Sequence, residues 1–166
     1  MSGHIIDLRP SELGLETKLG NQISNSIDRS AKILAGDVIL MNDYMRQYSQ
    51  ETHRPWPSRE YNCHGLSFAA RRTGIHFATE IAKILKDDEY AQVPEKKVIP
   101  GDIVIYYESG DVVHSGIVVQ INELKVPIVL SKWGNCHEVV HQLARCPYPT
   151  IDVRFYRIRS SHELNH

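Results

Sequence analysis

The sequence predicts an α+β fold, with helices in the first half of the chain and an antiparallel sheet in the second. Before residue 100, apolar residues recur at helical spacing, as at Phe77, Ile81, Ile84 and Leu85. From Ile103 onward, β-branched and aromatic residues form short runs in which apolar and polar positions alternate. Helices followed by strands, without regular alternation of the two, favour an antiparallel sheet over the parallel sheet of α/β proteins.

Length and composition fit one ordinary globular domain. The chain has 166 residues, of which 42% are hydrophobic and 23% charged, enough for a core and too apolar for disorder. A net charge of −1 argues against nucleic acid or an anionic membrane as partner. No run approaches the roughly 18 apolar residues of a membrane span, and no basic region precedes an apolar run at the start. We therefore expect a soluble protein without a signal peptide, cytoplasmic as made, with export by another route where the target is extracellular.

The helical half contains three predicted helices and one loop. A four-residue apolar step over residues 19–34 predicts an amphipathic helix that Gly36-Asp37 ends. Residues 50–60 carry two prolines around Trp56 and are expected to form an extended loop. A short helix is predicted from Cys63 to Arg72, with Asn62 as its N-cap and Gly74 as its C-terminal cap, and residues 77–85 form the third helix.

The sheet half contains four predicted strands, and a turn at Pro100-Gly101-Asp102 precedes them. Ser109-Gly110-Asp111 is expected to join the first two strands as a hairpin. The predicted strands are Ile103–Tyr107, Val112–Ile121, Val126–Ser131 and Val153–Ile158.

Nine histidines stand beside three cysteines, and two of these residues are placed for chemistry. At the first turn of a helix, Cys63 would meet free N–H groups and the helix dipole, which lower a thiol pKa and can hold an oxyanion. Gly65 would leave room for a substrate backbone. In the second strand, alternation puts His114 and Gly116 on one face, where a helix packed over the sheet could meet the imidazole. The alternatives are a buried, inert Cys63 and a His114 bonded to a loop carbonyl.

Three segments carry a resemblance to a known family. They are Tyr61-Asn62-Cys63-His64-Gly65-Leu66, Pro100-Gly101-Asp102 with the strand after it, and Val113-His114-Ser115-Gly116 with the strand it begins. In order and spacing they resemble the papain-like cysteine hydrolases of the NlpC and CHAP type. The resemblance implies a papain-like fold with Cys63 as nucleophile and His114 as general base. It also implies a peptide substrate, because many members cleave amide bonds in peptidoglycan stem peptides.

The resemblance spans residues 61–131 and leaves the third catalytic residue open. The family has a polar residue on the next strand that orients the histidine, and this position falls near Ser131. His141 could fold back to serve instead. Trp133, which follows that strand, either walls a substrate cleft or caps the core of the sheet.

The resemblance also suggests how the chain is organised. We expect an N-terminal helical region over residues 1–49, the papain-like core over 50–160 and a frayed tail over 161–166. No cofactor is implied, and the sequence does not predict an oligomeric state.

Two other functions compete with this interpretation. His137-Glu138-Val139-Val140-His141 would bind zinc if it were helical, with Glu163 as a distant third ligand of a metallopeptidase. A closed structural zinc site using Cys136 and Cys146 with the same histidines is a weaker variant, because the usual cysteine spacings are missing. The other competitor is a catalytically inactive papain-like binding module, since Ser131 is a weak orienting group.

Overall fold

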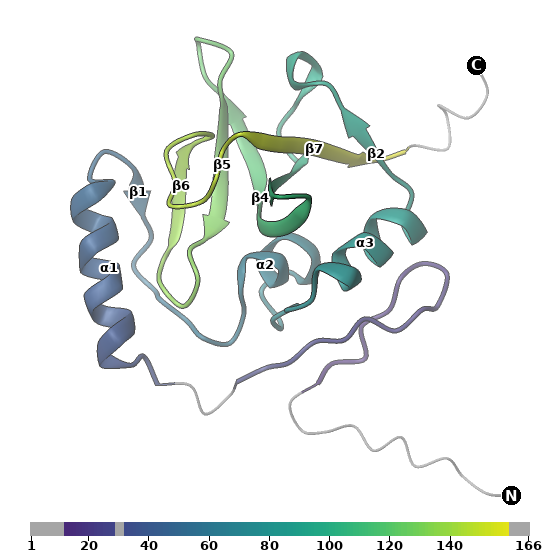
Figure 1. Ribbon diagram of the computed structural model, residues 1–166, viewed down its shortest axis with the longest axis horizontal. Coiled ribbons are helices and arrows are strands. Elements are labelled where there is room, and N and C mark those ends of the chain that lie inside the picture. Colours follow the sequence, from purple (N-terminus) through teal and green to yellow (C-terminus); the bar gives the residue numbers. More distant parts are fainter. Residues whose placement is uncertain (1–11, 29–31, 160–166) are drawn as a thin grey trace, which may run out of the picture.

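The computed structural model describes residues 12–28 and 32–159 and has an α+β architecture (Figure 1). Within those residues the helices are α1 (Ala35–Gln47), α2 (Cys63–Ala69) and α3 (Ala78–Asp87), with a short 3-10 helix at Glu95–Lys97. The strands are β1 (Thr52–His53), β2 (Tyr90–Val93), β3 (Ile103–Glu108), β4 (Asp111–Ile121), β5 (Pro127–Lys132), β6 (Glu138–Gln142) and β7 (Asp152–Ile158).

All seven described strands join one antiparallel sheet in the order β1-β6-β5-β4-β3-β7-β2. The long strand β4 lies at its centre, hydrogen-bonded to β3 on one side and β5 on the other. Figure 1 shows α1 alongside the β1–β6 end of the sheet and α2 crossing near β4. Contacts between α2 and β4, among them His64 with Ser115, place the start of α2, where Cys63 lies, against the middle of the sheet.

Both faces of the sheet are buried, which follows from the alternation of side chains along each strand. On β3, Val104 and Tyr106 belong to one core, while Ile103 and Ile105 belong to the other. Helix α1 covers the first core, to which it contributes Met41 and Tyr44, and its C-cap residue Tyr48 packs there as well. Helices α2 and α3 cover the second core, to which they contribute Ala69, Ile81 and Ile84.

The predicted α+β class, the four strands and the helix at residues 77–85 are confirmed, the last as α3. The turn before β3 is present, and the β3–β4 hairpin turns at Ser109 and Gly110, with φ angles of 52° and 87°. Two left-handed residues in succession give the tight turn whose twist matches that of the strands it joins.

The predicted helix over residues 19–34 is wrong where the structure describes it. Residues 12–28 are not helical, and they form isolated bridges at Glu16–Gln22 and Ser26–Gly74. Ile23, Asn25 and Ile27 are buried while the residues between them are exposed, so the segment alternates with period two. An apolar step of four residues fits that period as well as it fits a helix. Residues 29–31 of the prediction lie outside the described ranges.

Two helix boundaries also differ from the prediction. Gly36-Asp37 does not stop a helix but lies in the first turn of α1, where the Asp37 carboxylate accepts a hydrogen bond from the Leu34 N–H at 3.0 Å. Helix α2 ends at Ala69 rather than Arg72, because Ala70 and Arg71 turn left-handed, with φ angles of 48° and 66°.

We predict that Gly65→Ala destabilises the fold strongly. A Cβ at this position would lie 1.8 Å from the Thr73 carbonyl oxygen. Because this oxygen belongs to the backbone, it cannot rotate away from the clash as a flexible side chain could. We expect the free energy of unfolding to fall by roughly 3 kcal/mol, as for an overpacked core site, measured by urea denaturation. Gly36→Ala is the control: open space surrounds a Cβ there, and alanine in a helix gains up to about 1 kcal/mol over glycine. Equal stability of the two variants would contradict the packing described.

Candidate functional site

Cys63 opens α2, as the sequence predicts, and its N-cap fixes the start of the helix. The Asn62 side-chain oxygen accepts hydrogen bonds from the N–H groups of Gly65 at 2.9 Å and Ile75 at 3.1 Å. The amide nitrogen of Asn62 donates to the Ile75 carbonyl at 2.7 Å. One side chain therefore caps the helix and ties it to the segment that follows.

The environment of the Cys63 thiol differs from the prediction. The thiol is buried under β4, and this burial raises its pKa above the ordinary value. The N–H groups of Ser115, His64 and Cys63 and the Ser115 hydroxyl act in the opposite direction without reversing the shift. The predicted lowering of the Cys63 pKa is therefore wrong for this substrate-free form, because removal from water outweighs the polar groups at the helix start.

Ser115 is the polar link between α2 and β4. Its hydroxyl donates to the Ser67 hydroxyl at 3.0 Å and lies 2.8 Å from Nδ1 of His64. Burial lowers the pKa of His64 to about 4, so this imidazole is neutral at pH 7.

His114 points to the face opposite Ser115, into the first core. Its ring stacks on Tyr148, with centroids 3.6 Å apart and planes 7° from parallel, and tilts against Tyr106 at 5.2 Å. The side chain is fully buried, which lowers the His114 pKa well below its usual range. Within the described residues neither ring nitrogen has a hydrogen-bond partner, so the alternative of a loop-carbonyl bond is not met.

Cys63 and His114 do not hydrogen-bond to each other in the described structure. The thiol faces the N–H of Ser115, which belongs to the peptide bond that follows His114. It also lies close enough to Tyr148 for the two to interact electrostatically, and Tyr148 is the residue on which His114 stacks. Cys63 therefore lies in α2 on the Ser115 side of β4, while the His114 ring lies in the first core, so the predicted meeting of this helix with the imidazole is not seen in the described residues.

The two candidates for the third residue bond to each other. Ser131 Oγ lies 2.7 Å from Nε2 of His141 and accepts from the Trp133 indole N–H at 3.0 Å. His141 Nδ1 lies 2.8 Å from the Gln142 carbonyl, so it carries the proton, and Ser131 donates to Nε2. Burial lowers the pKa of His141 to about 4. Neither Ser131 nor His141 makes the predicted orienting hydrogen bond to His114 in the described structure.

Trp133 and Gly65 have structural explanations. Trp133 is 1% exposed and packs edge-on against Tyr44 of α1 and against Tyr48, the C-cap of that helix, so it caps the core and does not wall a cleft. The missing side chain of Gly65 makes room for the Thr73 carbonyl rather than for a visible substrate channel.

The proposed zinc motif lies on a strand, not on the helix that it requires. Glu138 to His141 belong to β6, where positions four apart are separated by roughly 13 Å. Glu138 is held by Arg71 and Tyr61. In the described residues no group of three or more metal-ligating side chains comes together, which includes Cys136 and Cys146. Glu163 lies outside the described residues.

The sequence interpretation missed the role of Lys132. Its buried ammonium donates to three carbonyl oxygens, those of Ser58 at 2.6 Å, Gly134 at 2.8 Å and Cys136 at 2.8 Å. Burial lowers the pKa of Lys132 to about 8, so the group stays mostly charged at pH 7. It ties the loop before α2 to the turn after β5. The sequence signal for this role was a lysine within an otherwise apolar predicted strand, and in the fold it lies on the face toward α2.

Comparison of the chain with family models, curated proteins and solved structures finds no match in any of the three. The motifs and the geometry above are therefore the basis for assigning a function. Among the described helices, none is both long and apolar enough to cross a bilayer.

We predict that acid destabilises the protein through its buried histidines. His64 and His141 have pKa values of about 4 in the fold, against about 6.5 in an unfolded chain. Below pH 6.5 the histidines of the unfolded chain become protonated, while those of the folded protein stay neutral. The free energy of unfolding therefore has its full value above pH 6.5 and falls as the pH is lowered toward 4. Each histidine contributes up to about 3 kcal/mol to this loss.

The measurement is urea denaturation at pH 7 and pH 4.5. His141→Gln, which keeps a hydrogen-bonding group but does not titrate, should lose less stability between the two pH values than the wild type. An equal loss in both proteins would show that His141 does not titrate in this way.

Proposed function

We propose that the chain is a cysteine hydrolase that cleaves an amide bond through a thioester on Cys63, with His114 as general base. The observation that carries the proposal is the imidazole of His114, which has no hydrogen-bond partner among the described residues. A buried polar group without a partner costs about 1–3 kcal/mol, and native structures retain such groups for a reason. A base that must accept a proton from the Cys63 thiol in the substrate complex would supply that reason.

The position of Cys63 gives a second line of support. The N–H groups of Cys63 and His64 already face the thiol sulfur at the start of α2. N–H groups in this position could also stabilise the oxyanion that forms when the sulfur attacks a carbonyl carbon. The same part of the chain, residues 61–131, carries the resemblance to papain-like hydrolases.

Burial favours the neutral thiol of Cys63 and the neutral imidazole of His114 in the free protein. The thiol proton must therefore move to His114 during the attack on substrate and not before it. A raised thiol pKa and a lowered imidazole pKa mean that Cys63 holds its proton and His114 is unprotonated, and both shifts oppose proton transfer between them in the free protein. Catalytic hydrogen bonds are often long before substrate binds. The proposal therefore requires the imidazole to reach the thiol in the substrate complex rather than in the free protein.

In the proposed reaction, Sγ of Cys63 bonds to the carbonyl carbon as its proton passes to His114. The C–N bond then breaks, and His114 gives that proton to the departing amine, which leaves a thioester. Water, deprotonated by His114, attacks the thioester, releases the carboxylic acid and restores the thiol. The resemblance favours peptides as substrates, with peptidoglycan stem peptides as the first class to test.

A papain-like binding module without catalysis is the second candidate. The raised pKa of Cys63 and the missing orienting bond to His114 both favour it. The two candidates differ in whether Cys63 can be acylated.

We predict that p-nitrophenyl acetate acylates Cys63 and releases a burst of p-nitrophenolate. Mass spectrometry should place the acetyl group on Cys63, and Cys63→Ala should abolish the burst. His114→Gln should slow acylation by roughly 10²–10⁴-fold, the range for loss of a general base.

Cys136 and Cys146 provide matched controls, because both thiols are also buried and have raised pKa values. Cys136→Ala and Cys146→Ala should keep the burst. Acetylation spread evenly over the three cysteines, or no effect of His114→Gln, would contradict the hydrolase and favour the binding module.

A further inference from the structure

A concavity of about 410 Å³ lies beside the start of α2. The loop after β1, the residues before and after α2, and the first residue of β6 form it. The described residues that line it are Arg54, Pro55, Trp56, Tyr61, Arg71 and Glu138. Tyr61 lies two residues before Cys63, so the concavity adjoins the proposed nucleophile in the chain.

The lining of this concavity carries a net positive charge. Glu138 is the carboxylate among the lining residues, and it faces two half-exposed arginines, Arg71 with Nη2 at 3.1 Å and Arg54 with Nη1 at 3.5 Å. Tyr61 donates its hydroxyl to the same carboxylate at 2.6 Å, and its pKa is raised, so it stays neutral. One carboxylate cannot neutralise two guanidinium groups. Glu138 pairs with part of each guanidinium, and among the described residues the remaining N–H groups of Arg54 and Arg71 are open to an anion.

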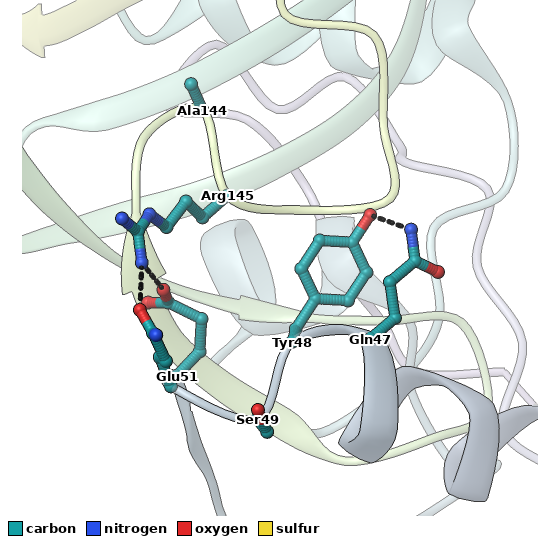
Figure 2. A pocket seen from close by; sticks show the side chains of 7 residues that line it. Gln47, Tyr48, Ser49, Glu51, Ala144 and Arg145 are labelled. Atoms are coloured by element: carbon teal, nitrogen blue, oxygen red, sulfur yellow. Dashed lines mark hydrogen bonds and ion pairs between the residues drawn. The ribbon is translucent and has the colours of Figure 1, made fainter.

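A second concavity of about 330 Å³ shows what a balanced arrangement looks like. Figure 2 shows Arg145 beside Glu51. The Arg145 guanidinium also donates to the Gln50 side-chain oxygen at 2.7 Å. There one half-exposed arginine meets one mostly buried glutamate. The two charges cancel, so this concavity has no unbalanced positive charge to attract an anion.

Trp56 gives the positive concavity an exposed aromatic surface. It is 81% exposed and stands between Pro55 and Pro57. The same loop is anchored by the hydrogen bond from Lys132 to the Ser58 carbonyl. Prolines and an anchored carbonyl restrict the loop, so the indole can accept an apolar group with little loss of conformational freedom.

The backbone at Arg71 is strained in a way that places its side chain. Ala70 and Arg71 are both left-handed, a conformation that costs non-glycine residues about 1–2 kcal/mol each. This turn directs the Arg71 guanidinium back across the end of α2 to Glu138. A glycine would relieve the strain but would remove the cation.

We propose that this concavity binds a carboxylate of an acidic peptide, with Arg54 and Arg71 holding the carboxylate and Trp56 the adjoining aliphatic carbons. The inference rests on the proposed function, since the concavity would then select peptide substrates with an acidic residue near the bond cleaved at Cys63. Guanidinium groups bind carboxylates with paired, charge-assisted hydrogen bonds, which suits this pair of arginines.

The test uses the full chain carrying Cys63→Ala, so that no turnover occurs. Isothermal titration calorimetry compares acetyl-Ala-Glu-Ala-amide with acetyl-Ala-Gln-Ala-amide. We expect the glutamate peptide to bind at least about tenfold more tightly, a difference equal to 1.4 kcal/mol. Arg54→Gln should remove most of the difference, while Glu138 keeps Arg71 as its partner. Trp56→Leu should weaken both peptides alike.

Arg145→Gln is the matched control, because Arg145 is equally exposed and paired but lines the balanced concavity. It should leave both affinities unchanged. Acrylamide quenching locates the peptide, because Trp56 is exposed and the second tryptophan, Trp133, is 1% exposed. The glutamate peptide should protect the quenchable fluorescence.

Equal affinity for the two peptides, or equal effects of Arg54→Gln and Arg145→Gln, would overturn the inference. Displacement of the glutamate peptide by inorganic phosphate at lower concentration would also overturn it, in favour of a phosphate-bearing ligand. The experiments distinguish failure of the proposed hydrolase from failure of the proposed peptide site. Peptide selectivity without acetylation of Cys63 would overturn the hydrolase alone, and acetylation without selectivity would overturn the peptide site alone.

Discussion

Burial of polar side chains at the junction of β4 and β5 is the constraint on which the rest of the structure depends. His114, Ser115, Ser131 and Lys132 have no exposed surface. In such a place each polar group must find a partner or carry a penalty. Ser115 joins α2 to the sheet, Ser131 joins Trp133 to β6, and Lys132 joins the Trp56 loop to the turn after β5. These bonds hold together the segments that surround Cys63.

The same burial sets the charge of the candidate catalytic groups. It favours the neutral thiol of Cys63 and the neutral imidazole of His114, so the protein at rest holds an uncharged pair. In the proposed reaction, activation comes with the substrate, through proton transfer at the moment of attack. The charged concavity around Arg54 and Arg71 lies outside this dry interior, and it is where a polar substrate group can be held without entering the core.

Local sequence patterns predicted the elements whose structure depends mainly on residues close to one another in the chain. The strands of the central sheet follow from period-two runs, and Asn62 correctly predicted where α2 begins. The helix predicted around Ile23 was wrong, because apolar residues four positions apart fit alternating burial in an extended segment as well as they fit a helix. His141 lies on a strand because β6 pairs with β5 and β1, which are contacts between distant segments. The unpartnered state of His114 and the charge of Lys132 depend on packing that a single sequence does not reveal.

The proposed reaction requires His114 to reach Cys63 when an acyl group or its mimic is bound. The most direct measurement is a crystal structure of the protein treated with a peptide aldehyde, which forms a tetrahedral adduct with a reactive thiol. We predict an adduct on Cys63 with a His114 ring nitrogen within about 3.5 Å of the sulfur or the new oxygen. An adduct in which His114 still stacks on Tyr148 with neither nitrogen bonded, or an adduct on Cys136 or Cys146, would contradict the proposed mechanism.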